Sequence, residues 1–310
     1  MEFKHIPVMP RECIEGLKIR PDGIYLDGTL GGGGHSELIL QQLVTGRLIA
    51  VDKDLDAIAN AKIRLAQYAD KITYIHDDFK NAIEHLNELS IEKLDGVLLD
   101  LGVSSYQLDN DERGFSYSAD APLDMRMDQT QYLTANKIVN EYSESEIANI
   151  IWEYGEDRLS RKIAWNICKQ RAIKKIETTG ELAQIVERSY PPQQRWKGGN
   201  PCKRTFQAIR IEVNGELREL DKAVKALTLR LREGGRICIM TFHSLEDRIV
   251  KRIFVELDAK CVCPPHQPIC NCNKRQDIII VTKKPLTAQA DELEVNSRAT
   301  CAKLRIAERI

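Results

Sequence analysis

The sequence contains no apolar run approaching the ~18 residues that a membrane-spanning helix needs, so we expect no membrane partner. Its first residues, Met1 to Pro7, lack the apolar segment of a signal peptide, which predicts a cytoplasmic protein. Internal repeats and low-complexity tracts are also missing, so the chain is not a repeat protein. With 43% hydrophobic and 29% charged residues, it is not intrinsically disordered either. These absences leave a globular protein.

Short apolar runs separated by helical patterns predict the fold. Because such strands are apolar throughout, they indicate a parallel sheet covered on both faces. Only helical patterns occur between 109 and 204, and 310 residues is long for one compact domain. We therefore predict an α/β, doubly wound, seven-stranded Rossmann-like domain (1–108 and 205–310) with an inserted all-α domain (109–204). The expected strands are 23–27, 47–52, 71–75, 94–100, 235–242, 277–281 and 302–307.

Several helices have sequence signatures. A helix is expected from His35 to Leu43, and one long helix from Phe206 to Arg232. Capping boxes start helices at Ser143-Glu144-Ser145-Glu146 and at Thr178 to Glu181. Trp152 and Trp165 recur at helical apolar spacing, which predicts core positions.

A glycine-rich loop, residues 27–35, follows the first strand and opens a helix. Glycines there allow positive φ and close approach of a ligand to the backbone. Asp52 ends the next strand, where a carboxylate accepts hydrogen bonds from ribose hydroxyls. The dinucleotide fingerprint G-x-G-x-x-G/A fails, because Ser36 or Glu37 stands at its last position. The loop therefore favours S-adenosyl-L-methionine over a dinucleotide.

The net charge of −1 conceals a segregated pattern. Residues 109–157 hold 12 acidic and 3 basic side chains, whereas 158–175 hold 7 basic and no acidic ones. A further 6 basic residues and no acidic one lie in 188–211, together with Tyr190, Trp196 and Phe206. Stretches of one sign indicate a polyanion partner, although ordinary surface lysines and arginines would explain them too. Trp196 or Tyr190 is then available for base stacking.

Nine cysteines, an odd number, favour thiols or metal ligands over disulfides. Two C-x-C pairs stand close together, Cys261 with Cys263 and Cys270 with Cys272. Four neighbouring thiols are a candidate zinc site, but the commoner spacing is C-x₂-C. The alternative is a surface loop of reduced thiols, and both interpretations remain.

With these features in view, the whole chain resembles the RsmH (MraW) family, bacterial methyltransferases that modify N4 of a cytosine in the decoding region of 16S ribosomal RNA. The matching motifs follow one another along nearly the whole sequence and are long. They are PDGIYLDGT (21–29) running into GGHS (33–36), DGVLLDLGVSSYQ (95–107), ERGFS (112–116), PLDMRMD (122–128), RTFQAIRIEVNGEL (204–217), TFHSLEDR (241–248) and LRIAER (304–309).

The resemblance implies the cofactor S-adenosyl-L-methionine and the partner 16S ribosomal RNA in the small ribosomal subunit. It makes the inserted domain, 109–204, the substrate-recognition domain. It also implies cofactor contacts at Gly33, Gly34, His35, Asp52, Phe79, Asp100 and Gln107.

The catalytic groups are less well defined by the sequence. Asp100 is our candidate for assisting the amine nucleophile, and holding the cofactor is its alternative role. His243 either contacts RNA or transfers a proton, or it makes a structural hydrogen bond beside a helix N-cap at Ser244. The strand-end motif reads Asp100-Leu101-Gly102-Val103 and lacks an aromatic residue. An extruded base would therefore stack elsewhere, and the candidates are Tyr106, Phe115, Tyr117 and Phe242.

Three other functions compete with this interpretation. The first is methylation of DNA or of a small amine, the second a non-catalytic RNA-binding protein. The third, a nicotinamide-dependent oxidoreductase, is disfavoured by the failed fingerprint.

Overall fold

The computed structural model describes residues 7–193, 196, 199–264, 267, 269 and 271–310. The chain forms two compact units: unit 1 comprises Met1–Gly102 and Leu217–Ile310, and unit 2 comprises Val103–Glu216. We expected the borders after 108 and 204. Helix α10 (Cys202–Asn214) lies in unit 2 because its apolar side chains, such as Phe206 and Ile209, belong to the core of that unit.

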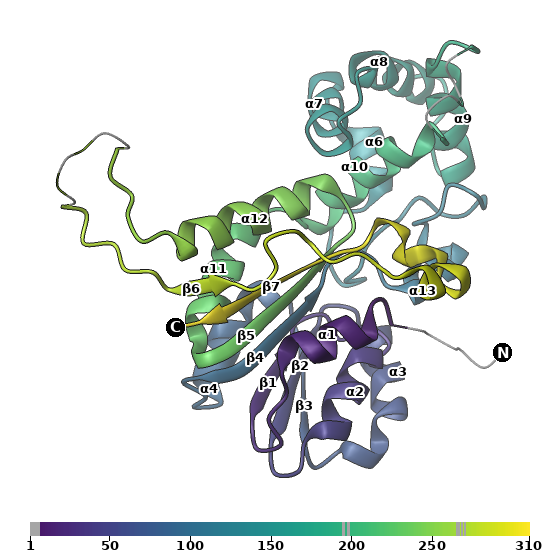
Figure 1. Ribbon diagram of the computed structural model, residues 1–310. Coiled ribbons are helices and arrows are strands. Elements are labelled where there is room, and N and C mark those ends of the chain that lie inside the picture. The colour runs from purple at the N-terminus through teal and green to yellow at the C-terminus, as the bar shows by residue number, and fades with distance from the viewer. Residues whose placement is uncertain (1–6, 194–195, 197–198, 265–266, 268, 270) are drawn as a thin grey trace. The chain divides into compact units, whose positions relative to one another are not determined.

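Unit 1 contains a seven-stranded mixed sheet in the order β3-β2-β1-β4-β5-β7-β6 (Figure 1). The first five strands run parallel, whereas β7 is antiparallel to both β5 and β6. The carboxyl ends of β1, β2 and β4 therefore meet at one edge of the sheet. The strands are β1 (Ile24–Asp27), β2 (Arg47–Asp52), β3 (Ile72–His76), β4 (Leu94–Asp100), β5 (Leu231–Thr241), β6 (Ile278–Ile280) and β7 (Lys303–Arg309).

Helices cover both faces of this sheet (Figure 1). Alternate residues of β4 show why its sequence is apolar throughout: Leu98 packs in the core on one face, and Val97 and Leu99 pack in the core on the other. The first face holds α1 (Pro10–Leu17), α2 (Gly34–Gln42) and α3 (Leu55–Arg64). The second holds α4 (Ala82–Glu88), α11 (Leu220–Arg230) and α12 (Ser244–Asp258). Shorter elements are η1 (Ala66–Tyr68), η2 (Phe79–Asn81), α13 (Ala290–Val295) and η4 (Ser297–Cys301).

Unit 2 is helical, and its described residues form no strand longer than an isolated bridge. Its core consists of apolar side chains from the longer helices, for example Ile151, Ile167 and Val186. Both expected capping boxes are present, at Ser143 and at Thr178. The elements are α5 (Ser105–Asp109), η3 (Asp111–Arg113), α6 (Ala135–Glu141), α7 (Glu144–Gly155), α8 (Ser160–Arg171), α9 (Thr179–Ser189) and α10.

Two sequence predictions were wrong. The long helix expected from 206 to 232 is two helices, because Gly215 ends α10 with φ 57° and Glu219 precedes α11 with φ 58°. Trp152 and Trp165 are not core residues, since they are 57% and 50% exposed. Among the described residues, no helix is long and apolar enough to cross a membrane.

Candidate cofactor site

The glycine-rich loop leaves β1 at the carboxyl edge of the sheet and ends at the first turn of α2. Gly31 and Gly33 have φ of 49° and 76°, which glycine adopts without strain. A Cβ on Gly33 would lie 3.2 Å from Leu65 Cδ1, so the loop is also closely packed from below. Helix α2 begins after Gly33 without a side-chain cap. The loop thus presents backbone and a helix N-terminus, which suits an anionic group such as a carboxylate.

Asp52, the last residue of β2, fixes this loop. Its Oδ2 accepts a hydrogen bond from the Gly31 N–H at 2.7 Å, and its Oδ1 accepts one from the Asp54 N–H at 2.9 Å. Burial raises the pKa of Asp52 to about 6, although these two N–H groups lower it. Each carboxylate oxygen can accept a second hydrogen bond, so the side chain still suits ribose hydroxyls.

A second carboxyl, Asp27, lies buried at the end of β1. The Ser36 hydroxyl donates to its Oδ2 at 2.7 Å, and the Thr29 N–H donates to its Oδ1 at 3.1 Å. Burial nevertheless raises the pKa of Asp27 to about 6. Asp27 therefore connects the start of the loop to the first turn of α2.

Asp100, at the end of β4, is the most perturbed carboxyl of this edge. Its N–H donates to Thr29 Oγ1 at 2.6 Å, but its Oδ1 is buried and has no hydrogen-bond partner within the described parts of the chain. Burial, and then the charges of Asp27 and Glu246, raise the pKa of Asp100 to about 8. A buried acceptor without a donor is costly, which makes this carboxyl a candidate ligand-binding group.

His35 lies beside Asp100 and is buried. Its Nε2 lies 2.9 Å from the Val8 carbonyl oxygen, which only accepts, so Nε2 carries the proton. Its Nδ1 lies 3.7 Å from Asp100 Oδ2. The imidazole thus closes one side of the space in front of the Asp100 carboxyl.

Phe79 begins η2, just past β3, and is partly buried. A Cβ on Gly28 would lie 2.9 Å from Phe79 Cβ, so this aromatic residue packs directly against the start of the glycine-rich loop. The predicted residues of unit 1 (Gly33, Gly34, His35, Asp52, Phe79 and Asp100) therefore all follow the carboxyl ends of β1 to β4.

Gln107 belongs to unit 2 and is buried at the third position of α5. Its Oε1 accepts from the Ser104 N–H at 3.0 Å, and its own N–H donates to Ser104 Oγ at 3.2 Å. This capping box explains its local role, and its predicted cofactor contact stays a prediction.

His243 is itself the N-cap of α12, so the cap is not Ser244 as we expected. The Glu246 N–H donates to His243 Nδ1 at 3.5 Å, and Glu246 Oε2 accepts from the N–H groups of Phe242 and His243 at 2.9 and 3.3 Å. The imidazole Nε2 lies 3.1 Å from Glu246 Oε1 but outside hydrogen-bond geometry. This arrangement gives His243 a structural role and leaves its catalytic role a prediction.

Asp27 and Glu246 are two further carboxyls of this candidate site that were not predicted from the sequence. Both are nearly inaccessible to solvent, with 1% of each exposed, and both raise the pKa of Asp100. Asp27 is the first residue of the glycine-rich loop and Glu246 lies in the TFHSLEDR segment, so both belong to motifs that could have indicated them. Their shared effect on one carboxyl is visible only in three dimensions.

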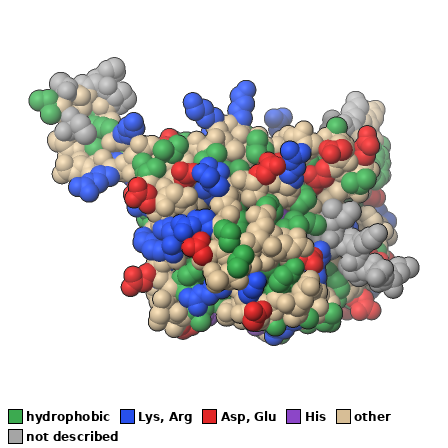
Figure 2. Space-filling model, turned by 60° about the horizontal axis from the view of Figure 1, so that its bottom comes forward, with side chains coloured by type: hydrophobic (Ala, Val, Ile, Leu, Met, Phe, Trp, Pro, Cys, Tyr) green, Lys and Arg blue, Asp and Glu red, His purple; other side chains and the backbone are tan. Residues whose placement is uncertain are grey.

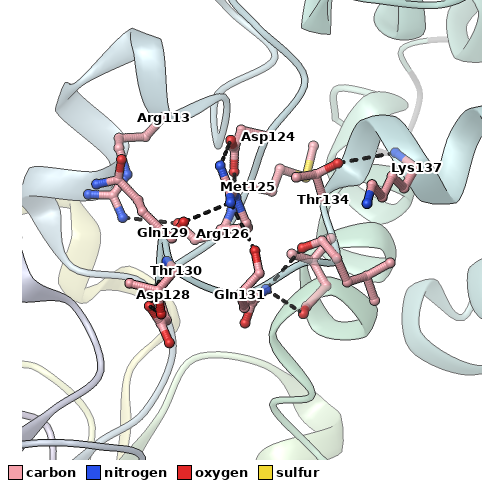
Figure 3. A network of polar contacts seen from close by, with 12 residues as sticks. Arg113, Asp124, Met125, Arg126, Asp128, Gln129, Thr130, Gln131, Thr134 and Lys137 are labelled. Atoms are coloured by element: carbon pink, nitrogen blue, oxygen red, sulfur yellow. Dashed lines mark hydrogen bonds and ion pairs between the residues drawn. The ribbon is translucent and has the colours of Figure 1, made fainter.

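In unit 2, the PLDMRMD segment is locked by its own side chains (Figure 3). Arg126 binds both oxygens of Asp124, at 2.8 and 2.7 Å, and also donates to the carbonyls of Gln129 and Gln131. Arg113 is buried and donates to the carbonyls of Arg126 and Met127 at 2.9 Å each. These two arginines stabilise the segment, so any phosphate contact of unit 2 would have to come from other, exposed cations.

Helix α8 offers such cations. Arg161, Trp165 and Lys169 recur every four residues and are all exposed, so they form one stripe along the helix. Lys169 Nζ lies 4.9 Å from the centroid of the Trp165 ring. Tyr190, in contrast, packs against the core, and its hydroxyl binds Asp157. Trp165 is therefore an exposed aromatic residue beside a basic side chain, Trp196 is exposed as well, and Tyr190 is the weaker candidate.

The candidate stacking residues differ in their surroundings. Phe115 is buried in the core of unit 2, and Tyr117 packs edge-on against Phe206 at 5.6 Å. Tyr106 and Phe242 are partly buried. The first two are thus already engaged in packing.

The cysteine cluster lies between α12 and β6. The sulfur atoms of Cys261, Cys263 and Cys272 all lie within 4.8 Å of one another. Cys270, the fourth thiol of the predicted zinc site, lies outside the described residues.

A Rossmann-like sheet with a glycine-rich turn and a strand-end carboxylate defines an α/β protein that binds a nucleoside-containing cofactor. The chain belongs to the MraW methylase family, whose family model matches residues 2–310. It is therefore a methyltransferase, and the family and the fold class predicted from the sequence are both confirmed.

Full-length relatives support this assignment. The chain is 50% identical over 311 residues to the protein called ribosomal RNA small subunit methyltransferase H of Clostridioides difficile, covering 100% of both chains. It is 52% identical over 311 residues to the protein of that name from Clostridium botulinum strain Kyoto, again covering 100% of both. The corresponding protein of Heliobacterium mobile is 48% identical over 312 residues, with the same coverage.

Proposed function

We propose that this chain transfers a methyl group from S-adenosyl-L-methionine to N4 of a cytosine in the decoding region of 16S ribosomal RNA, in the cytoplasm. The observation that carries the choice of cofactor is the Asp100 carboxyl: its buried Oδ1 has no hydrogen-bond donor among the described residues, and the charges of Asp27 and Glu246 raise its pKa. Acids so close together disfavour an anionic ligand and favour a cationic one. The ammonium and sulfonium groups of this cofactor suit such a site, whereas the pyrophosphate of a dinucleotide does not.

The residues of the site match the parts of the cofactor. Gly33, Gly34 and His35 would lie under the methionine part, whose carboxylate suits the N-terminus of α2. Asp52 would accept the ribose hydroxyls, and Phe79 would flank the adenine. By resemblance, Gln107 of unit 2 is a further contact. When bound, the cofactor supplies a methyl group on a positively charged sulfur.

The acceptor amine needs help from the protein, because the lone pair of the cytosine amino group is delocalised into the ring. A carboxylate that accepts an N–H bond raises the electron density on this nitrogen. Asp100 has the position and the vacant Oδ1 for this role, and also for binding the ammonium of the cofactor. Once N4 carries the methyl group, it must lose one proton, and Asp100 is the candidate acceptor of that proton.

The RNA partner is supported by the basic stripe on α8. Arg161 and Lys169 flank Trp165, so a phosphate backbone and a stacked base would find complementary groups on one face. Within unit 2 we assign this role to α8 and not to Arg113 or Arg126, because the guanidinium groups of these two arginines are engaged in internal contacts.

Mass mapping of small-subunit ribosomal RNA from cells with and without the gene tests the reaction. Cells that lack the gene should lose one methyl group from a single cytosine of the decoding region. The wild-type gene and an Asp22→Asn control should restore it, and Asp52→Ala should not. An unchanged methylation pattern would end the proposal, and loss of a methyl group from another base would reject cytosine N4.

The two roles of Asp100 are separable by an Asp100→Asn variant. If Asp100 binds the ammonium, the variant should lose affinity for S-adenosylhomocysteine in calorimetry by about tenfold, which is the loss of about 1.4 kcal/mol. If it acts on the substrate amine, affinity should persist while single-turnover methylation of small subunits slows. No binding of either cofactor form by the wild-type protein would favour a non-catalytic RNA-binding protein.

A further inference from the structure

The described ends of the connection between α12 and β6, residues 259–264 and 271–277, extend away from the sheet as two arms (Figure 1). Figure 2 shows them standing out from the rest of unit 1, with Lys or Arg side chains near their base. The described apolar residues of the connection are mostly exposed, with Val262 at 62% and Ile269 at 78%. Hydrophobic burial therefore does not hold the two arms together, so another interaction must do so.

Cys261 and Cys263 lie on the first arm and Cys272 lies on the second, and their thiols come close together. Their sulfur atoms lie within 4.8 Å of one another, and Cys261 Sγ lies 3.7 Å from Cys272 Sγ. A disulfide would need about 2.05 Å. Zinc binds thiolates at about 2.3 Å, which places two sulfurs of a tetrahedral site about 3.8 Å apart. The observed separation is that of a thiol–thiol hydrogen bond, it is too long for a disulfide, and it is also close to the spacing of two thiolates on one zinc ion.

Backbone N–H groups point at two of these sulfurs. The Cys263 N–H donates to Cys261 Sγ at 3.3 Å, and the Val262 N–H donates to Cys272 Sγ at 3.5 Å. Hydrogen bonds to the charged form of a group stabilise that form, so both contacts favour thiolates. Thiolates are the form in which cysteine binds zinc.

We propose that Cys261, Cys263 and Cys272 bind one zinc ion, which fixes the two arms of residues 259–277 to each other. On binding, each thiol loses its proton and forms one sulfur–zinc bond, and a further donor or water completes four-coordination. The ion is structural: it replaces the hydrophobic core that this segment lacks. None of these cysteines belongs to the proposed methyl-transfer site, so the failure of one proposal would leave the other intact.

The test uses the full chain, purified with a reductant and without chelator, and measures zinc by elemental mass spectrometry. We expect about one zinc per chain and a thiolate-to-metal charge-transfer band after cobalt replaces zinc. Cys272→Ser should weaken zinc binding at least about tenfold in competition with a chelator. The matched control is Cys301→Ser, which changes an exposed cysteine outside the cluster and should leave zinc binding unchanged.

Two further measurements keep the proposal testable if a variant is unstable. Adding zinc to the metal-free wild-type chain should slow amide hydrogen exchange in 259–277 and leave the exchange of β1 and β4 unchanged. Less than about 0.2 zinc per chain after incubation with zinc, together with no cobalt charge-transfer band, would overturn the proposal. A mass two hydrogens below that of the reduced chain, from a disulfide among these cysteines, would overturn it as well.

Discussion

The raised pKa of Asp100 allows the number of protons released on cofactor binding to be predicted. With a pKa of about 8, this carboxyl is about 90% protonated at pH 7 in the free protein. A cationic ligand stabilises the charged form, so binding of S-adenosylmethionine should expel that proton. We expect a net release of about 0.8 proton per cofactor at pH 7 and about none at pH 8, because the amino group of the cofactor, with a pKa near 8, must itself be protonated to bind.

The same linkage fixes the direction of the pH dependence. Because the proton must leave before the charge pair forms, affinity should rise with pH below pH 8, by at most about tenfold per unit. Above about pH 8 it should fall again, because the ammonium of the cofactor then loses its own proton. Asp27 and Asp52, each with a pKa of about 6, titrate lower, so the measurement belongs above pH 6.5. Asp100→Asn removes the titrating carboxyl and should abolish the rise in affinity between pH 6.5 and 7.5.

Calorimetry in buffers of different ionisation enthalpy measures this proton release directly. Asp22→Asn is the control, because Asp22 is an exposed carboxyl and should leave the release unchanged. If the wild-type protein released less than about 0.2 proton at pH 7, Asp100 would not face a cation. If Asp100→Asn released as much as the wild type, the proton would come from another group.

Three further variants test the geometry. Gly33→Ala should weaken S-adenosylhomocysteine binding about tenfold in calorimetry, whereas Gly234→Ala, also with φ 76° but with no described atom within 4 Å of its Cβ, should not. Arg126→Ala should destabilise unit 2 by about 2–3 kcal/mol in urea denaturation, since the Asp124 carboxylate loses its partner; an unchanged midpoint would contradict this role. Trp165→Ala should lower RNA affinity about 5-fold or more in filter binding, and a Trp152→Ala control on acidic α7 should not.

The sheet was predictable from the sequence because each strand is short, apolar and separated by helical patterns. All seven predicted strands are present, and their ends differ by a few residues. The antiparallel placement of β7 between β5 and β6 was not predicted, because apolar runs do not reveal strand direction.

The errors have identifiable causes. Gly215 is a residue type that commonly ends helices, and this signal was outweighed because the apolar pattern stays helical from 206 to 232. The positive φ at Glu219 has no signature in the residue type. Trp165 has the spacing of a core residue, but on α8 the core positions are Ile163, Ala164 and Ile167. Periodicity predicts which face of a helix is buried, but it does not predict which residues at the border of that face are exposed.

The carboxyl cluster shows why the chemistry of the site could be predicted only in part. Asp27, Asp52 and Asp100 each end a parallel strand, and adjacent parallel strands end at the same edge, so their approach follows from topology alone. Glu246 does not end a strand. It is the third residue of α12, the helix that follows β5, and its side chain completes the capping box with His243. Its charge helps to raise the pKa of Asp100 although 146 residues separate them in the sequence. A capping interaction that contributes a few tenths of a kcal/mol to about 2 kcal/mol thus has a second effect, because its buried carboxylate also raises the pKa of Asp100.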